Sequence, residues 1–319
     1  MESKRCLYCY KLLQEGQVDY HPTCSKKIFD SKEVPLLEFT EEQMLELADQ
    51  VIKSKIAVTG VQPKLSLEIL RDKEKHSDKR FTIVGLWGGY ILKPPTKQFS
   101  FLPELEDLTM NLATVSKINT VPHSLIRLKN GKLAYITKRI DRVKGKKIHM
   151  EDMCQLTERM TEFKYRGSYE QIGKTILKYS SNPGLDLINF FEQVVFSFLT
   201  GNADMHLKNF SLINQPGLGH VLTPAYDMLS TALVMEEDDE DLALTLNAKK
   251  KKIRRKDFEA SFKLFEIPQK AQDKIFAKFQ KTIPSWFDLI EVSFLPQEMK
   301  EQYIALIHER VNRLGMLIS

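Results

Sequence analysis

The most informative stretch of the chain is GNADMHLKNFSL, residues 201–212, which is followed by TPAYDMLS, residues 223–230. It places Asp204 and Asn209 in a D-x-x-x-x-N spacing, with Asp227 further along. Phosphoryl transfer from ATP needs a carboxylate that orients the attacking hydroxyl, and an amide oxygen and a second carboxylate that hold Mg²⁺. Asp204 suits the base role, and Asn209 and Asp227 suit magnesium. Asp and Asn are also common turn formers, so the pair alone leaves a structural role open.

Two upstream residues fit the phosphate-binding part of such a site. Lys93 ends the apolar segment of GGYILKPP, and Glu106 lies on the helix predicted next, within PELEDLTM. In kinases a strand lysine contacts the α- and β-phosphates, and a glutamate on a helix holds that lysine. A lysine at a strand end is also an ordinary solvated terminus, and Glu104 and Asp107 are alternative partners.

A loop that covers phosphate should precede this lysine. The candidate segment is KIAVTGVQPKLSLEIL, residues 55–70, which has a single glycine and therefore lacks a G-x-G-x-x-G pattern. Successive backbone amides could still face phosphate as a nest; an ordinary turn explains the composition equally well. The residues concerned are Val58, Thr59, Gly60, Val61 and Gln62.

Periodicity divides the chain into a strand-rich half and a helical half. Apolar alternation predicts a half-buried strand over 65–70, and shorter strands follow at 81–84, 90–93, 124–127 and 133–137. Helices are predicted from a capping box at Thr40–Gln43 and over 101–118, 169–179, 186–200, 257–264, 268–281 and 297–317. Strands followed by helices indicate an α+β, bilobal architecture.

The composition excludes several classes of protein. In 319 residues, 42% are apolar and 28% are charged, which rules out disordered, collagenous and coiled-coil chains. The net charge of +5 is too small to argue for nucleic-acid binding.

Six acidic residues at 236–241 are followed by a basic run at 249–256. We expect a solvated mobile loop whose halves attract each other; the alternative is a docking strip for a charged partner. No signal peptide or membrane-length apolar run is visible, so we expect a cytoplasmic protein without membrane contact.

Three of the four cysteines cluster near the N-terminus with a histidine. Cys6-x-x-Cys9, eleven further residues and His21-x-x-Cys24 give four soft ligands in a zinc-knuckle-like spacing. A structural Zn²⁺ is one reading. Reduced thiols without metal are the other, because a single knuckle is short and Pro22 constrains the second pair. We expect Cys154 to pack rather than react.

Eight short motifs together resemble the HipA-type serine/threonine kinase toxins, from about residue 55 to the C-terminus. They are AVTGVQPKLSL, YILKPP, LPELEDLTMNLA, ITKRIDR, HMEDMCQ, LTGNADMHLKNFSL, LTPAYDMLST and LALTLN. The resemblance implies a bilobal protein-kinase-like fold with a small strand-rich N-lobe and a helical C-lobe. We therefore expect a cysteine segment over 1–30, an N-lobe over 31–137 and a C-lobe over 138–319.

The resemblance also carries over roles for individual residues. Asp204 matches the catalytic base, Asn209 and Asp227 match the magnesium ligands, and Lys93 matches the lysine that contacts ATP. Residues Val58 to Lys64 match the phosphate loop, which adds Lys64 to the candidates. Further expected nucleotide contacts are the hinge residues Lys138, Arg139 and Ile140, together with Asp141, His206 and Lys208.

Two departures from the family pattern matter. HipA-like kinases autophosphorylate a serine in the phosphate loop, but Ala57 stands at that position here, and the second site of the HipT type corresponds to Thr59. We therefore expect any autophosphorylation at Thr59. The chain is also short for the family, which resembles the split HipT arrangement with a separate small N-subdomain-like antitoxin.

The resemblance extends to partners and substrate. It implies a toxin–antitoxin system with a helix-turn-helix repressor, DNA contact only through that repressor, and an aminoacyl-tRNA synthetase as the phosphorylated protein. Two alternatives stay open on the residues alone. One is a small-molecule kinase of the aminoglycoside or lipid type, and the other is an inactive kinase-fold module that binds a repressor or nucleic acid.

Overall fold

The computed structural model describes residues 4–44, 46–47, 64–71, 79–84, 88–143, 145–235 and 239–317. The chain divides into two compact units. The first comprises residues 1–107 and 121–145, and the second comprises residues 108–120 and 146–319. The cysteine-rich segment belongs to the first unit, and the division falls within the helix α3 (Leu102–Val115). Strand-rich and helical parts therefore follow one another as predicted, and the α+β class is confirmed.

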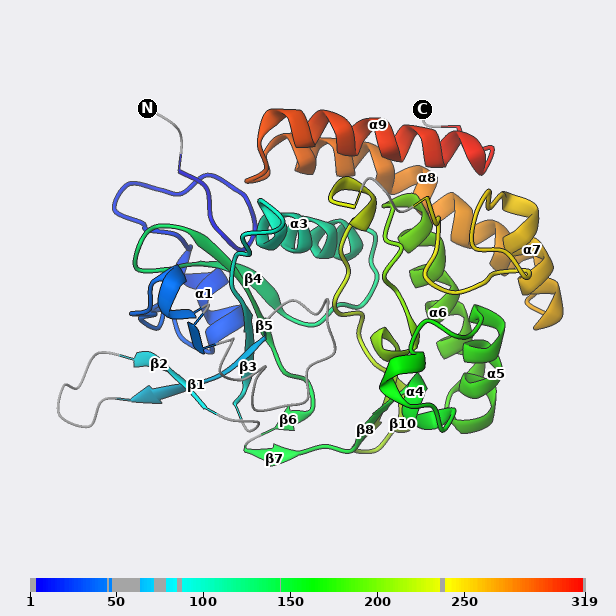
Figure 1. Cartoon of the computed structure of the whole chain (residues 1–319), viewed down its shortest axis with the longest axis horizontal. Coiled ribbons are helices and arrows are strands. Elements are labelled where there is room, and N and C mark those ends of the chain that lie inside the picture. Colours follow the sequence, from blue (N-terminus) through cyan, green and yellow to red (C-terminus); the bar gives the residue numbers. More distant parts are fainter. Residues whose placement is uncertain are drawn as a thin grey trace. The chain divides into compact units, whose positions relative to one another are not determined.

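An antiparallel five-stranded sheet in the order β2-β1-β3-β5-β4 forms the first unit's centre (Figure 1). The strands are β1 (Leu65–Arg71), β2 (Lys79–Ile83), β3 (Tyr90–Lys93), β4 (His123–Arg127) and β5 (Leu133–Lys138). The predicted alternation is confirmed where Leu65 and Leu67 are buried and Ser66 between them is half-buried. Because β3 lies between β1 and β5, Lys93 ends a central strand.

The segment before the sheet contributes a short helix and a capped helix start. In α1 (Pro22–Phe29) a proline occupies the first turn, where its missing N–H has no intrahelical partner to lose. The ring of Phe29 packs edge-on against Phe81 of β2, with centroids 5.7 Å apart. The predicted capping box is also present: the Gln43 amide N–H donates to Thr40 Oγ1 at 3.4 Å, and the Thr40 N–H donates to Gln43 Oε1 at 2.9 Å.

Helix α3 ends earlier than the periodicity predicted. Leu105, Leu108 and Leu112 are buried as expected. Val115, however, is 37% exposed, and the helix stops there rather than at Ile118. The cause is Lys117, which takes a left-handed conformation (φ +59°) and lets the Ile118 N–H donate back to the carbonyl of Ala113 at 3.0 Å.

The second unit is mainly helical, with a three-stranded sheet in the order β10-β9-β8. Its helices are α4 (Met153–Leu156), α5 (Tyr169–Tyr179), α6 (Pro183–Leu199), α7 (Arg255–Leu264), α8 (Gln269–Glu291) and α9 (Gln297–Arg313). Its strands are β8 (Met150–Asp152), β9 (Ser211–Gln215) and β10 (Gly219–Leu222). Single 3₁₀ turns lie at Thr161–Phe163, Leu207–Asn209 and Thr231–Leu233. Two further strands are only two residues long: β6 (Arg142–Val143) in the first unit and β7 (Lys146–Lys147) in the second.

The prediction that a helix ends at residue 281 was wrong. Helix α8 continues through Pro284 to Glu291 (Figure 1). An interior proline costs about 3 kcal/mol, but Trp286 and Ile290 beyond it are fully buried. The Trp286 indole N–H also donates to Ser116 Oγ at 2.8 Å. Burial of two large side chains outweighs the lost backbone bond.

In their described parts, 239–241 and 249–256, the opposed charge runs pair locally, as expected, but these residues are not merely a solvated loop. Lys250 pairs with Glu240 at 3.0 Å, and Lys251 pairs with Asp239. Asp241 is buried and accepts hydrogen bonds from Arg313 and from the backbone N–H of Ile253, the latter at 2.9 Å. The apolar residues between the runs, among them Leu242, Leu244 and Leu246, belong to the core. Within the described ranges no helix is long and apolar enough to cross a membrane.

Candidate active site

Lys93 of the first unit forms a buried ion pair with Glu106. Lys93 Nζ contacts Glu106 Oε1, and the two side chains are only 5% and 1% exposed. The ring of Tyr135, which faces Lys93 across the β3–β5 ladder, lies 5.3 Å from the ammonium. Of the three carboxylates considered from sequence, Glu106 is therefore the partner. Burial instead raises the pKa of Glu104 to about 7.

The third carboxylate of that helix, Asp107, makes different contacts. Its Oδ2 accepts a hydrogen bond of 2.7 Å from the hydroxyl of Tyr10, and its Oδ1 lies 2.8 Å from His123 Nδ1. Asp107 is fully buried, so these polar contacts compensate its loss of water. Glu106 and Asp107, which are consecutive on α3, thus make different polar contacts.

The predicted hinge segment already uses much of its hydrogen-bonding capacity. The backbone N–H groups of Lys138 and Arg139 donate to the carbonyls of Pro122 and Gly89, at 2.8 Å each. These two N–H groups therefore already have acceptors within the protein. Burial alone would raise the pKa of Asp141, but hydrogen bonds from Arg139 and the nearby charge of Arg142 lower it overall.

The second unit holds the D-x-x-x-x-N loop in a defined conformation directly after α6. Gly201 turns the chain at φ +64°, where an added Cβ would lie 2.6 Å from Leu306. The carbonyl of Asp204 accepts two bonds of 2.8 Å, from the backbone N–H of His206 and from Asn209 Nδ2. The backbone of Asp204 is thereby fixed while its carboxylate stays 43% exposed. The amide nitrogen of Asn209 is thus bonded within the loop.

His206 lies close to both carboxylates of the predicted site. Its Nε2 is 3.9 Å from Asp204 Oδ1. Burial lowers the pKa of His206 to about 4, although Asp204 and Asp227 both act to raise it. The ring is therefore neutral at pH 7. Asp227 itself has a left-handed backbone (φ +55°), a conformation that few non-glycine residues adopt and that Asp adopts more readily than most.

Sequence reasoning missed Tyr165, a lone aromatic residue outside any recognisable motif. Its hydroxyl donates to Asp204 Oδ1 at 2.5 Å, and its ring packs edge-on against His206 with centroids 4.9 Å apart. The ion pair between Lys208 and Asp152, at 2.5 Å, was not predicted from the sequence either. Lys208 thus has a protein partner where a nucleotide contact was expected.

The predicted phosphate loop falls on residues outside the described ranges. These are Val58, Thr59, Gly60, Val61 and Gln62, together with Ala57. Lys64 is described and lies exposed immediately before β1.

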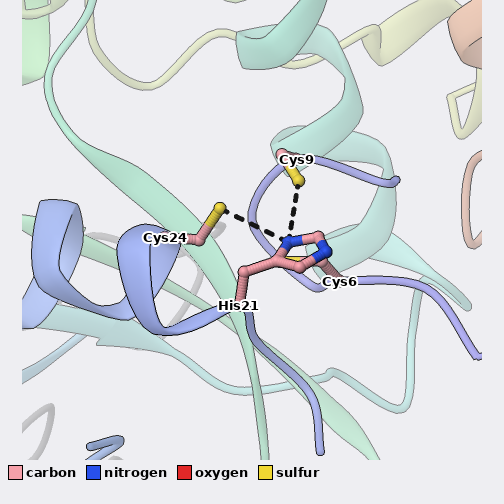
Figure 2. A group of neighbouring side chains, drawn as sticks. All are labelled: Cys6, Cys9, His21 and Cys24. Atoms are coloured by element: carbon pink, nitrogen blue, oxygen red, sulfur yellow. Dashed lines mark hydrogen bonds between the residues drawn. The ribbon is translucent and has the colours of Figure 1, made fainter. Parts of the chain in front are cut away.

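The four N-terminal metal-ligand candidates come together as the spacing predicted. The ligand atoms of Cys6, Cys9, His21 and Cys24 all lie within 4.8 Å of one another. Figure 2 shows the imidazole of His21 directed at the thiols of Cys9 and Cys24. All four cysteines of the chain are described, and none of them forms a disulfide.

Two features match the residue pattern of kinases. One unit holds a strand lysine paired with a helix glutamate, and the other holds a D-x-x-x-x-N loop followed by a further aspartate. Residues 56–287 match the family model described as the HipA-like C-terminal domain. The chain therefore belongs to the HipA-like family.

Individual relatives agree with this assignment. Y4dM of Sinorhizobium fredii, whose name provisionally assigns it to the kinases, is 32% identical over 62% of this chain and 50% of that protein. The serine/threonine-protein kinase toxin HipA of Shewanella oneidensis is 27% identical over 61% of this chain and 47% of that protein. The chain spans about half the length of the curated relatives it matches.

Two solved structures show the same fold. HipA of Shewanella oneidensis, in a complex with HipB and operator DNA, superimposes with a TM-score of 0.67 at 19% identity, over 96% of this chain and 75% of that one. The Helicobacter pylori proinflammatory kinase CtkA gives a TM-score of 0.52 at 16% identity, over 70% of this chain and 87% of that one.

Proposed function

We propose that this protein is an ATP- and Mg²⁺-dependent protein serine/threonine kinase. The observation that carries the proposal is the state of Asp204: its backbone is fixed by His206 and Asn209, and its exposed carboxylate already accepts a hydroxyl's hydrogen bond from Tyr165. A substrate serine needs a carboxylate with the same accessibility and acceptor geometry.

The residues present fit the required cofactors. Asn209 and Asp227 offer an amide oxygen and a carboxylate, which are the hard oxygen ligands that Mg²⁺ prefers. When bound, Mg²⁺ neutralises charge that develops on the phosphates. Lys93, held by Glu106, adds a fixed positive charge for the α- and β-phosphates, so it needs no reorganisation during the reaction.

In the proposed reaction Asp204 orients the serine hydroxyl and takes its proton. A bond forms between the serine oxygen and the γ-phosphorus, and the bond from that phosphorus to the β–γ bridging oxygen breaks, which releases ADP. His206 is neutral at pH 7 and so leaves the negative charge of Asp204 intact. The lysine–glutamate pair and the loop act chiefly by positioning.

The likeness to HipA supports a finer proposal about regulation and partners. We place the chain in a toxin–antitoxin system, with a helix-turn-helix repressor as partner and an aminoacyl-tRNA synthetase as substrate; the complex of HipA with HipB and operator DNA supports the repressor. Thr59 is the proposed autophosphorylation site, because Ala57 carries no hydroxyl. Phosphate mapped by mass spectrometry to another residue, or absent after incubation with ATP, contradicts this assignment.

Labelled ATP distinguishes the proposed function from its alternatives. Purified protein is incubated with γ-labelled ATP and Mg²⁺, alone, with a panel of aminoacyl-tRNA synthetases, and with aminoglycoside and lipid acceptors. We expect label on protein serine or threonine in the wild type and none with Asp227→Asn. Label found only on aminoglycoside or lipid acceptors indicates a small-molecule kinase. Nucleotide binding without any transfer indicates an inactive binding module.

A further inference from the structure

The N-terminal cysteine–histidine cluster has the dimensions of a metal site. His21 Nδ1 lies 3.5 Å from Cys9 Sγ and 3.7 Å from Cys24 Sγ (Figure 2). Tetrahedral Zn²⁺ binds sulfur at about 2.3 Å and nitrogen at about 2.0 Å, which separates a sulfur and a nitrogen ligand by about 3.5 Å. The two observed distances therefore match neighbouring ligands of one zinc ion, and neither thiol needs a large movement.

The other nitrogen of His21 fixes which atom can bind metal. His21 Nε2 lies 3.0 Å from the carbonyl oxygen of Leu12. Because a carbonyl can only accept a hydrogen bond, Nε2 of the neutral ring carries the proton and Nδ1 presents its lone pair to the sulfurs. A backbone carbonyl that orients the imidazole in this way is the usual outer partner of a metal-bound histidine.

Backbone turns hold both ligand pairs. In the first pair, the Tyr10 N–H donates to the carbonyl of Cys6 at 2.9 Å, which closes the turn that contains Cys9. In the second pair, His21 caps α1 and the Cys24 N–H donates to the His21 carbonyl at 2.9 Å. Pro22 thus starts the helix that directs Cys24 toward His21. The constraint that Pro22 imposes is therefore compatible with the approach of His21 and Cys24.

The cluster is joined to the lysine–glutamate pair through Tyr10. Tyr10 directly follows Cys9, is 1% exposed, and has a left-handed backbone (φ +60°) that a bulky residue adopts only under constraint. Its hydroxyl donates to Asp107 Oδ2 at 2.7 Å. Asp107 is the residue after Glu106 on α3, so the Tyr10 hydroxyl is bonded to the helix turn that carries Glu106.

A second path leads from the same aspartate to the lysine. Asp107 Oδ1 contacts His123 Nδ1 at 2.8 Å, and the His123 ring stacks on Tyr135 with centroids 6.0 Å apart. The Tyr135 ring in turn lies against the ammonium of Lys93. A series of three contacts therefore leads from Asp107 through His123 and Tyr135 to Lys93.

We propose that Cys6, Cys9, His21 and Cys24 bind one Zn²⁺ ion, and that the zinc-bound segment acts through Tyr10 as a positioning element for Glu106 and Lys93. Soft thiolates with one imidazole select zinc among common divalent ions. The metal site stands without any kinase activity, whereas the positioning role rests on the proposed function.

Zinc content tests the first part. Full-length protein expressed with added zinc is assayed for metal by mass spectrometry, and Co²⁺ replacement is followed by its tetrahedral absorption bands. We expect one zinc per chain in the wild type and in Cys154→Ala, loss of zinc in Cys9→Ser, and recovery in Cys9→His, because zinc accepts two Cys and two His ligands. The zinc site is overturned if the wild type contains no metal, or if two of these cysteines form a disulfide in protein purified under reducing conditions.

ATP affinity tests the second part. Tyr10→Phe keeps all four ligands and loses only the hydroxyl that contacts Asp107, and Tyr8→Phe is the matched control within the same turn. We expect full zinc content in both variants, and ATP affinity about tenfold weaker only in Tyr10→Phe, since a hydrogen bond to a charged group is lost. The positioning role is overturned if Tyr10→Phe and Tyr8→Phe bind ATP equally well. It is also overturned if wild-type protein that stays folded after zinc is removed with a chelator binds ATP as tightly as the zinc-bound protein. If the wild type and both variants fail to bind ATP, the proposed function fails while the zinc result stands.

Discussion

Replacing both members of the buried ion pair should cost far less stability than replacing either one. Lys93 and Glu106 are 5% and 1% exposed, so Glu106→Leu leaves a buried ammonium without this counter-ion. Removing one partner of such a pair costs about 3–5 kcal/mol. If Lys93→Met cost the same and the effects were additive, the double variant would lose about 6–10 kcal/mol.

We expect the Lys93→Met/Glu106→Leu double variant to be within about 2 kcal/mol of the wild type, because apolar residues of similar volume replace a costly buried pair. Urea denaturation followed by circular dichroism measures all four proteins, and Glu259→Gln in the exposed Arg255 pair is the control, with a change below about 0.5 kcal/mol. All Lys93 variants should lack phosphotransfer. A double variant that loses the full additive sum refutes the reasoning.

Three other perturbations follow from the second unit. The folded-state pKa of His206 is about 4, below its ordinary value, so only the unfolded chain takes up a proton at this residue as the pH falls from about 6.5 to 4. The free energy of unfolding should therefore fall by up to about 3 kcal/mol over that range, and by less in His206→Gln. Denaturation at each pH measures this change. Tyr165→Phe releases the Asp204 carboxylate from a competing hydroxyl and should raise kcat/KM by about 2- to 10-fold; a fall would show instead that Tyr165 positions Asp204. Asp241→Asn removes the buried charge that Arg313 contacts and should lower the free energy of unfolding by about 3–5 kcal/mol, whereas an unchanged denaturation midpoint would show that this pair contributes nothing.

Local pattern was sufficient for most of the strands and for the pairs of residues that lie close in sequence. The apolar run that ends in Lys93 is a strand with the predicted bounds, Tyr90–Lys93. The cysteine spacing correctly predicted a four-ligand cluster, because turns and a helix start impose the approach locally. The choice of Glu106 over Glu104 and Asp107 needed the structure, since three carboxylates within one helical turn differ only in which side of the helix they occupy.

Long-range contacts explain what the sequence could not predict. Tyr165 reaches Asp204 across 39 residues, and Tyr10 reaches Asp107 across 97, so no local periodicity records either contact. The extension of α8 past Pro284 depends on the burial of Trp286, which outweighs the local preference of proline to end a helix. Tertiary packing decided each of these cases.

The most direct test of the account compares ATP binding and phosphate transfer in the wild type and Asp204→Asn. The substitution keeps the size of the side chain but removes the proton acceptor, and general-base catalysis contributes about 10²- to 10⁴-fold. We predict an unchanged Kd for Mg-ATP and a loss of transfer of at least about 100-fold. Transfer by Asp204→Asn at the wild-type rate, with ATP bound equally well, would contradict the assignment of Asp204 as the catalytic base.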